Sequence, residues 1–348
     1  MIDVEVAILH LEPDPDAGPL VRATADARME LADQHRRGFL AAGARAATVH
    51  AGRADDVSFG ERLRDLAAGI GDGGLIVLGS GAIPLATAAD RRDLVGAARG
   101  TEGAALTNNR YSADVVAIAR ARSVLRTVPD LATDNMLPRW LDEVAGIPVS
   151  DRPARRRLGV DVDGPLDLVL IGGRWLAHLD RVDVERVTSA IEAVRRVAAD
   201  AHGELLVAGR ISAANLAWLE RETASRTRAL IEERGLRTRR PGQRPAASVL
   251  GALVERDGPG SFGTHVARLG DGAVIDSRVL LAHRSGADEA GWPRAEDRFA
   301  SDLLLADQIA DPWLRALTES AREASVPIVL GGHTLVGPGL PLALGRSR

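Results

Sequence analysis

The feature of this sequence that most limits its fold is a regular alternation of short apolar runs with longer stretches of helical periodicity. A β-α-β-α order of this kind predicts an α/β fold, with a mostly parallel sheet and helices on both faces. Ligands of such sheets bind at the carboxyl ends of the strands, so the residues directly after each predicted strand are the first candidates for function. In the first half we predict strands at Val4–Leu9, Ala46–His50, Leu75–Leu78, Gly103–Leu106, Val115–Ala119 and Leu158–Val162, and helices at Val21–Ala42, Phe59–Ile70, Ala88–Ala98 and Met136–Val144.

The second half continues the alternation, which predicts a second α/β domain. A chain of 348 residues is long enough for two domains, and we place them at residues 1–174 and 175–348. The stretch Arg237–Pro245 combines charge with Pro and Gly and is the best candidate for a mobile loop. Here we predict helices at Asp183–Ala199, Asn215–Arg234 and Asp311–Ala324, and strands at Glu204–Val207, Ala273–Ile275, Val279–Ala282 and Ile328–Leu330.

Composition excludes several kinds of chemistry. The absence of cysteine rules out disulfides, thiolate nucleophiles and cysteine-ligated metal sites. All 44 residues in the Lys+Arg count are arginine, so any phosphate must be bound by arginine, backbone N–H groups or a metal. The net charge of −4 argues against a general nucleic-acid binder. No apolar run approaches the ~20 residues that span a membrane, and no basic segment precedes the first apolar run, so we expect a cytoplasmic protein without membrane partners.

Two short polar segments follow predicted strands of the first half. Gly79-Ser80-Gly81 contains two glycines, which allow a ligand to approach the backbone closely. In the cluster Thr107–Ser112, the amides of Asn108 and Asn109 can read a base or a sugar edge, and Arg110 can bind an anion through two N–H groups. Both segments also have a structural interpretation, as turns that use Gly or Asn for special backbone angles.

A third candidate site is acidic. Asp161 and Asp163 lie at the end of a predicted strand, where residues two apart face the same side. Carboxylates placed in this way suit Mg²⁺, which prefers oxygen ligands. Helix capping is the alternative, with Asp163 as the N-cap and Asp167 as a favourable acid in the first turn. The preceding arginines, between residues 152 and 157, either neutralise a phosphorylated ligand or form a solvated loop.

In their order and spacing, residues 75–95, 103–119 and 158–170 resemble the nucleotidyltransferases of the GT-A-like superfamily. The likeness is greatest to the molybdenum-cofactor and phospholactate guanylyltransferases, which add a nucleotidyl group to cofactor precursors. It implies a nucleotide-diphospho-sugar transferase-like domain that takes a nucleoside triphosphate, Mg²⁺ and a phosphorylated or anionic acceptor. The resemblance places ligand-binding groups at Gly79, Ser80, Gly81, Asn108, Asn109 and Arg110, and metal ligands at Asp161 and Asp163.

The chain departs from this family at two positions that matter for catalysis. The family's metal-binding Asp after the middle strand corresponds to Ser80 or Gly81, and its Gly-rich phosphate loop corresponds to an acidic segment without lysine. Two functions therefore stay open for the first half: a diverged Mg²⁺-dependent nucleotidyltransferase, and a non-catalytic binding or assembly protein on the same scaffold. Either would bind a nucleotide or a phosphorylated small molecule, and either is compatible with a homo-oligomer.

The second half offers a third, unrelated function. His333 follows the last predicted strand within a glycine-rich run and can act as a general acid or base. Asp276, Ser277, Arg278 and His283 follow or end other strand-like segments, but their spacing does not match a nucleophile elbow. No family resemblance extends beyond about residue 175, and the sequence identifies no catalytic residue.

Overall fold

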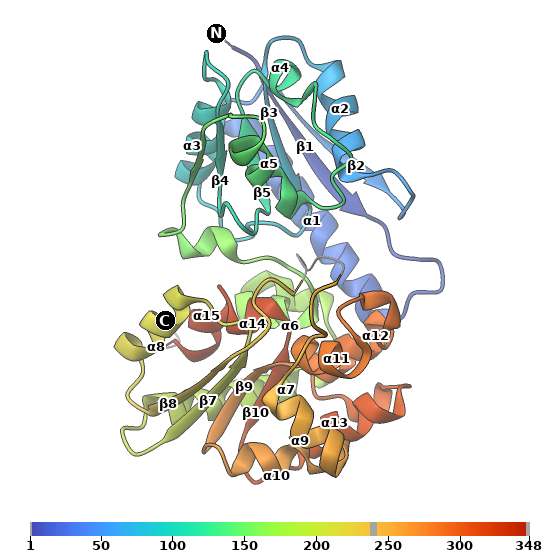
Figure 1. Ribbon diagram of the computed structural model, residues 1–348, viewed down its shortest axis with the longest axis vertical. Coiled ribbons are helices and arrows are strands. Elements are labelled where there is room, and N and C mark those ends of the chain that lie inside the picture. The colour runs from blue at the N-terminus through green and yellow to red at the C-terminus, as the bar shows by residue number, and fades with distance from the viewer. Residues whose placement is uncertain (1, 237–241, 346–348) are drawn as a thin grey trace. The chain divides into compact units, whose positions relative to one another are not determined.

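The computed structural model describes residues 2–236 and 242–345, and the chain forms two compact units (Figure 1). The first unit consists of Met1–Asp16 and Ala25–Val162, and the second of Ala17–Thr24 and Asp163–Arg348. Each unit contains its own sheet with helices on both faces, which confirms the predicted α/β class. The change between the units falls at residues 162 and 163, earlier than the boundary expected after residue 174.

The first unit has a six-stranded sheet in the order β2-β1-β3-β5-β4-β6. Every neighbouring pair is parallel except the two pairs that β5 makes with β3 and β4. The chain adds β2 on one side of β1 and then β3 on the other, so its winding direction reverses between β1 and β3. The crevice at such a reversal is the usual ligand site of an open α/β sheet. The strands are β1 (Val4–Leu11), β2 (Ala46–Gly52), β3 (Gly74–Gly79), β4 (Ala105–Thr107), β5 (Val115–Ile118) and β6 (Val149–Asp151).

Helices bury both faces of this first sheet because apolar side chains alternate along its central strands. Ile76 and Leu78 of β3 join the core that contains Phe39 of α1, whereas Leu75 and Val77 join the core of α2, α4 and α5. The helices of the first unit are α1 (Pro19–Ala41, which begins in the second unit), α2 (Phe59–Gly69), α3 (Ala88–Ala98), α4 (Ala121–Leu125) and α5 (Leu137–Glu143), with 3₁₀ turns η1 (Asp134–Met136) and η2 (Arg156–Gly159).

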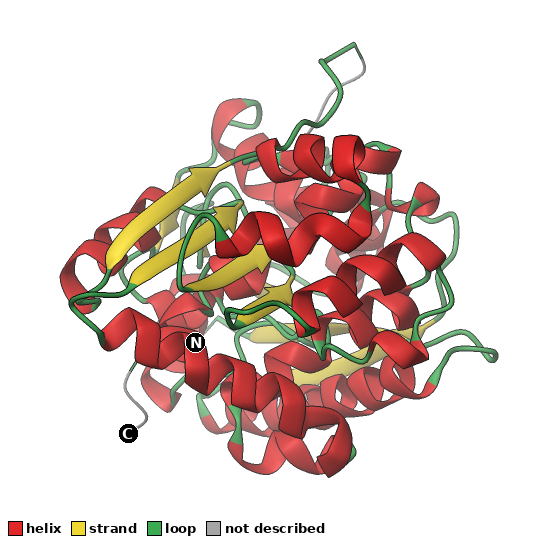
Figure 2. Cartoon of the chain, turned by 90° about the horizontal axis from the view of Figure 1, so that it is seen from below, coloured by secondary structure: helices red, strands yellow, loops and turns green. Residues whose placement is uncertain are grey.

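The second unit has a fully parallel four-stranded sheet in the order β10-β9-β7-β8. Figure 2 shows its strands side by side among the surrounding helices. Here too the winding direction reverses, between β7 and β9, because β8 lies on one side of β7 and β9 on the other. The strands are β7 (Glu204–Gly209), β8 (Arg226–Ile231), β9 (Gly272–Asp276) and β10 (Ile328–Gly331).

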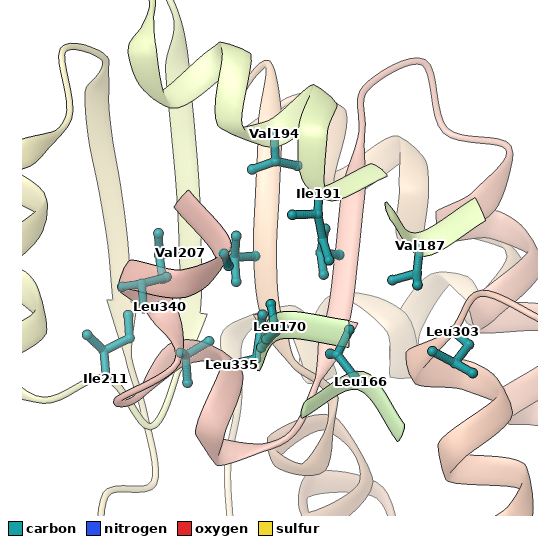
Figure 3. Packing of buried hydrophobic residues seen from close by; sticks show 14 of the residues in the cluster. Leu166, Leu170, Val187, Ile191, Val194, Val207, Ile211, Leu303, Leu335 and Leu340 are labelled. Atoms are coloured by element: carbon teal, nitrogen blue, oxygen red, sulfur yellow. The ribbon is translucent and has the colours of Figure 1, made fainter. Parts of the chain in front are cut away.

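One face of the second sheet is covered by α7, whose Val187, Ile191 and Val194 recur at helical spacing and point into the core (Figure 3). They pack in one cluster with Val207 of β7 and Leu340 of α15. The helices of this unit are α6 (Pro165–Ile171), α7 (Arg181–Ala199), α8 (Ala213–Glu222), α9 (Val249–Asp257), α10 (Phe262–Ala267), α11 (Ser277–Ser285), α12 (Ala295–Asp302), α13 (Pro312–Arg322), α14 (His333–Val336) and α15 (Leu340–Leu344), and its 3₁₀ turns are η3 (Gly173–His178), η5 (Pro259–Ser261), η6 (Glu289–Gly291) and η7 (Ala306–Gln308). Among the described helices of the whole chain, none is both long and apolar enough to cross a membrane.

Three predicted elements are wrong. The strand expected at Leu158–Val162 is a 3₁₀ turn followed by a single bridge between Asp161 and Ala82. The helix expected at Asn215–Arg234 ends at Glu222, and its second half is the exposed edge strand β8. The strand expected at Val279–Ala282 is helical, because a short buried apolar run has no period that separates strand from helix. Of the mobile-loop candidate Arg237–Pro245, residues 237–241 lie outside the described part.

Two glycines of the first unit predict opposite effects on stability. A Cβ on Gly74 at the start of β3 would lie 2.0 Å from the carbonyl oxygen of Ala98, so Gly74→Ala should lower the free energy of unfolding by about 1–3 kcal/mol. Gly96 lies on the exposed side of α3 with no described atom near its Cβ position, so Gly96→Ala should raise it by about 0.5–1 kcal/mol. Urea unfolding measures both, and changes of the same sign would contradict the packing of α3 against β3.

Candidate functional site

A buried pair of side chains lies at the winding reversal of the first sheet. His10 near the end of β1 and Ser80 directly after β3 are both buried, and His10 Nδ1 lies 3.0 Å from Ser80 Oγ. The backbone N–H of Ser80 also donates to the carbonyl of Leu9 (2.8 Å). Burial lowers the pKa of His10, and the positive charge of Arg28 lowers it further, which favours a neutral ring. Ser80, predicted as a ligand group, is thus held by His10 at the carboxyl end of β3.

The loop that follows Ser80 has an unusual backbone. Ile83 is fully buried and has a φ of 45°, a left-handed conformation that β-branched residues rarely adopt. The buried ring of His35 fixes the preceding peptide, since its Nε2 lies 2.7 Å from the carbonyl oxygen of Ala82. Arg91 Nη2 lies 3.4 Å from Nδ1 of the same ring. Arginine only donates, so Nδ1 is the acceptor and Nε2 carries the proton. Strained backbone of this kind is found mainly at ligand sites.

The two predicted glycines of this loop differ in the space around them. At Gly79, apart from the residue itself and its two chain neighbours, no described atom lies within 4 Å of the position a Cβ would take. At Gly81, a Cβ would lie 2.8 Å from the carbonyl oxygen of Val162 and 2.9 Å from Oδ1 of Asp161. The backbone at Gly79 is therefore open to a ligand, whereas the place beside Gly81 is filled by the protein itself.

Asn108 has a structural role, which it fulfils through its side chain and not through a left-handed backbone. Its Nδ2 donates to Asp114 Oδ2 (2.6 Å) and to the carbonyl of Leu158 (2.9 Å). Its Oδ1 accepts from the backbone N–H groups of Asp114 (3.0 Å) and Val115 (3.4 Å). An amide has two N–H donors and two acceptor lone pairs, so protein partners use its full capacity. The proposed reading of a base edge by Asn108 has no support in this geometry.

Arg110 and Asn109 also serve the local fold. Arg110 donates to Asp142 (2.9 Å) and to the carbonyl of Val149 (2.6 Å), so the two ends of its guanidinium are already engaged. Asn109 is exposed, and its Oδ1 accepts from the backbone N–H of Tyr111 (3.0 Å), as in an Asx turn. Of the predicted polar cluster, only Asn109 leaves most of its amide to solvent.

The arginines before Asp161 bind carboxylates of α3. Arg157 makes two hydrogen bonds with the fully buried carboxylate of Asp90 (2.7 and 2.8 Å), and Arg155 bridges Asp90 and Asp93 (3.2 and 2.8 Å). Burial acts to raise the pKa of Asp90, but hydrogen bonds from Arg157 and Thr87 outweigh it and hold that pKa far below its ordinary value. These arginines neutralise the protein's own charge, so neither a phosphate clamp nor a freely solvated loop describes them.

The acidic residues expected to bind Mg²⁺ do not share a strand. Asp161 belongs to the first unit, where its Oδ1 accepts from the N–H of Val162 (2.8 Å), and Asp163 belongs to the second. Asp167 accepts from the backbone N–H groups of Asp163 and Gly164 (both 2.8 Å), and Gly164 rather than Asp163 is the N-cap of α6. Across the described residues, no group of three or more His, Asp or Glu side chains is placed to hold a metal ion. Mg²⁺ binding therefore stays a prediction.

The winding reversal of the second sheet is occupied by a buried ion pair. Arg210 directly follows β7, and its guanidinium makes two hydrogen bonds with Asp276 at the end of β9 (2.5 and 3.0 Å). Burial acts to raise the pKa of Asp276, but Arg210 outweighs it and the pKa lies below its ordinary value. Gly209 has a φ of 122°, and a Cβ there would lie 2.3 Å from Asp276 Cβ, so glycine is required for the pair to close.

A second buried pair lies next to the first. Arg278, in the first turn of α11, makes two hydrogen bonds with Asp302 (both 2.6 Å) and a third with Ser277 Oγ (2.9 Å). Burial acts to lower the pKa of Arg278, but the charge of Asp302 outweighs it and the pKa lies above its ordinary value. His333 is the first residue of α14, shortly after β10, which is parallel to β9, so this histidine also lies at the same edge of the sheet.

The structure brings some predicted residues together and separates others. In the second unit Asp276, Arg278 and His333 gather at one sheet edge, while His283 lies apart, with Nδ1 accepting from the N–H of Ser248 (3.2 Å). Sequence reasoning missed Arg210, although it follows a predicted strand, and it missed Asp302, which lies at the end of a helix.

No family model and no curated protein matches this chain. Its function therefore has to be inferred from its own residues and their geometry. Two places stand out on that basis: the loop 79–86 of the first unit, and the buried arginine–aspartate pairs of the second.

The neighbouring residues Asn108 and Asn109 provide a matched pair of substitutions. Asn108→Ala removes every hydrogen bond of a buried amide and should lower the free energy of unfolding by about 1–3 kcal/mol. Asn109→Ala removes one exposed turn contact and should lower it by about 0.5 kcal/mol or less. Urea unfolding of both variants tests the assignment. Equal effects would mean that Asn108 does not tie β5 to the segment before Asp161.

The buried His35 predicts a pH dependence of stability. Burial, together with the charge of Arg91, lowers the pKa of His35 from 6.5 to about 3. Between these values the unfolded chain binds a proton that the folded chain does not, so stability is complete above pH 6.5 and falls as the pH drops towards 3. Each pKa unit corresponds to about 1.4 kcal/mol.

His35→Gln should make the loss of stability on acidification shallower over this range, as followed by urea unfolding at a series of pH values. The exposed His202 offers the control, since His202→Gln should leave the slope unchanged. Equal slopes in the wild-type chain and in His35→Gln would show that His35 is not neutral and buried.

Proposed function

We propose that the first unit binds a nucleotide or another phosphorylated small molecule at the carboxyl edge of its sheet, without transferring a nucleotidyl group. The observation that carries the proposal is the strained loop after β3, with the fully buried Ile83 at a φ of 45°. A left-handed β-branched residue costs of order 1–3 kcal/mol and persists only where neighbouring groups hold it in place. The loop lies at the winding reversal between β1 and β3, where such sheets bind ligands.

At the carboxyl edge of the first sheet, a ligand would be bound mainly by backbone groups. Gly79 is open on its Cβ side, which allows a ligand to contact the strand end directly. His35 and Arg91 fix the loop by hydrogen bonds to the carbonyls of Ala82 (2.7 Å) and Ala86 (2.9 Å), so little conformational entropy is lost when a ligand binds. A preorganised backbone of this kind suits a phosphate group in a chain without lysine.

The same geometry supports binding over transfer. The resemblance implies a metal-binding carboxylate after β3. At this place Ser80 is hydrogen-bonded to His10, and atoms of Asp161 and Val162 leave no room for a side chain on Gly81. The arginines that would hold the phosphates during transfer bind carboxylates of the protein. Arg110 binds Asp142. Arg152, Arg155 and Arg157 bind Asp93 and Asp90. Few charged groups are left to stabilise a leaving pyrophosphate, which is the main requirement of nucleotidyl transfer.

Calorimetric titration with ATP, GTP, CTP and UTP, each with and without Mg²⁺, tests the proposal. Gly79→Leu fills the open space beside the strand end and should weaken the best nucleotide about tenfold or more, which equals about 1.4 kcal/mol. Gly96→Leu adds the same side chain to an open, exposed position of α3 and should leave affinity unchanged.

Chromatography of the nucleotide after incubation with Mg²⁺ should recover it intact. Two results would overturn the proposal. One is the absence of saturable binding by any of the nucleotides, and the other is equal affinity in the Gly79→Leu and Gly96→Leu variants. Catalytic release of pyrophosphate would instead support a nucleotidyltransferase and contradict the binding-only function.

A further inference from the structure

The strand β8 lies at an edge of the second sheet, and within the described part of the chain it pairs only with β7 (Figure 1). The backbone N–H groups of Arg226 and of Glu232, which directly follows the strand, donate to carbonyl groups on the β7 side (2.9 and 3.0 Å). Successive residues of a strand point their backbone groups in opposite directions, so Thr227, Ala229 and Ile231 turn their N–H and C=O groups away from β7. An open row of this kind is a template for pairing with another strand.

The charges at the start of β8 restrict which strand can pair there. The side chains of Arg226 and Arg228 share the carboxylate of Glu204, which forms an ion pair with the first and lies 3.9 Å from the second. Two positive charges thus face one negative charge. Arginines on an edge strand repel another basic strand, so a partner strand has to bring a negative charge to this end of β8.

The other end of β8 provides a negative charge. The carboxylate of Glu232 accepts hydrogen bonds from Ser248 Oγ (2.8 Å) and from the backbone N–H of Val249 (2.6 Å), and both donors are neutral. Its charge therefore remains available to an arginine. Two large apolar side chains lie near it, Ile231 and Val249, which are 47% and 58% exposed. The strand thus has a basic start and an end that is acidic and apolar.

A second copy of β8 in antiparallel orientation brings these two ends together. With a twofold axis at Ala229, the open sides of both strands face each other, and Arg226 of one copy lies opposite Glu232 of the other. The same register places Thr227 opposite Ile231. Each of these contacts occurs twice, because a twofold interface is self-complementary.

A surface hollow supports this register. It has a volume of about 310 Å³ and is lined by Glu204, Arg226, Thr227 and Arg228. Since Thr227 lies opposite Ile231 of the second copy, the exposed isoleucine side chain is placed to enter this hollow. Its burial adds apolar contact to the backbone hydrogen bonds of the strand pair.

Neighbouring registers are less favourable. A twofold axis at Arg228 would set the two copies of this arginine directly against each other, and like charges in opposite positions destabilise a strand pair. An axis at Leu230 would place Arg226 opposite Arg234, which again is of like charge. An axis between two residues would set the open groups of one strand against groups already bonded to β7. Ala229 is therefore the preferred centre.

We propose that the chain forms a homodimer through β8, in which two copies pair antiparallel about Ala229 and join their second sheets into one. The partner is thus another molecule of the same chain. The contact consists of one short strand pair with its flanking side chains, which is small for a permanent interface, so the dimer exchanges reversibly with the monomer. It is independent of the nucleotide site proposed for the first unit.

Sedimentation velocity of the full chain, from micromolar to millimolar concentration, should show a monomer–dimer equilibrium. Ala229→Pro removes the N–H at the twofold axis, which points away from β7, and edge strands tolerate proline at such positions. It should weaken dimerisation about tenfold or more. Ala51→Pro is the matched control and should leave dimerisation unchanged. Ala51 is exposed on the edge strand β2 of the first sheet, next to Gly52, whose carbonyl accepts from Glu12 on the β1 side (2.9 Å).

Charge reversal tests the register. Arg226→Glu places two acidic residues opposite each other and should also weaken dimerisation about tenfold or more. Arg256→Glu likewise reverses an exposed arginine that forms an ion pair, but at the end of α9 remote from Val249, and should have no effect.

A mixture of Arg226→Glu with Glu232→Arg restores opposite charges at both contacts, so the two variants should form a heterodimer although neither self-associates. A purely structural role of either residue would give no such rescue. Circular dichroism checks that Glu232→Arg, which loses two hydrogen bonds, is folded. The absence of a heterodimer between folded variants would overturn the proposal.

Three further results would overturn it. The first is a wild-type chain that stays monomeric up to millimolar concentration. The second is equal dimerisation of Ala229→Pro and Ala51→Pro, and the third is equal dimerisation of Arg226→Glu and Arg256→Glu.

Discussion

In each sheet of this protein the winding direction reverses between two neighbouring hydrogen-bonded strands, and a buried side-chain pair links the carboxyl ends of these strands in both units. His10 and Ser80 join β1 to β3 in the first, and Arg210 and Asp276 join β7 to β9 in the second. The helices that follow β1 and β3, α1 and α3, pack in one core on the same face of the first sheet, whereas α2 packs on the other face. The two pairs satisfy polar groups that burial would otherwise leave without partners, which would cost about 1–3 kcal/mol each.

In the first unit, most polar side chains near the carboxyl edge of the sheet stabilise the fold. The side chains that the sequence predicts for a nucleotide site mostly form hydrogen bonds with other groups of the protein. Asn108 links β5 to the segment before Asp161, and Arg157 neutralises the buried Asp90. The part of the edge still accessible is backbone, at Gly79 and in the rigid loop behind it. Under the proposed function, the first unit favours binding over transfer because these side chains already bind groups of the protein itself.

Strand ends could be located from the sequence, but the partners of the residues there could not. The alternation of apolar runs placed Ser80 correctly after β3, yet His10 comes from a strand 70 residues away and no local pattern joins them. Arg210 was within reach, because it lies shortly after the predicted strand Glu204–Val207 and directly after the observed β7, whereas Asp302 pairs with Arg278 across 24 residues of chain. The run Val279–Ala282 was assigned as a strand because burial on all sides removes the periodicity that separates helix from strand.

The central claim is that a nucleotide binds at the carboxyl edge of the first sheet, beside the winding reversal. Hydrogen–deuterium exchange, read by mass spectrometry, measures this directly on the full chain with and without nucleoside triphosphate. The account predicts that nucleotide slows exchange in the peptide covering residues 79–86. Protection confined to the amino ends of the strands, or no protection with any nucleotide, would contradict it.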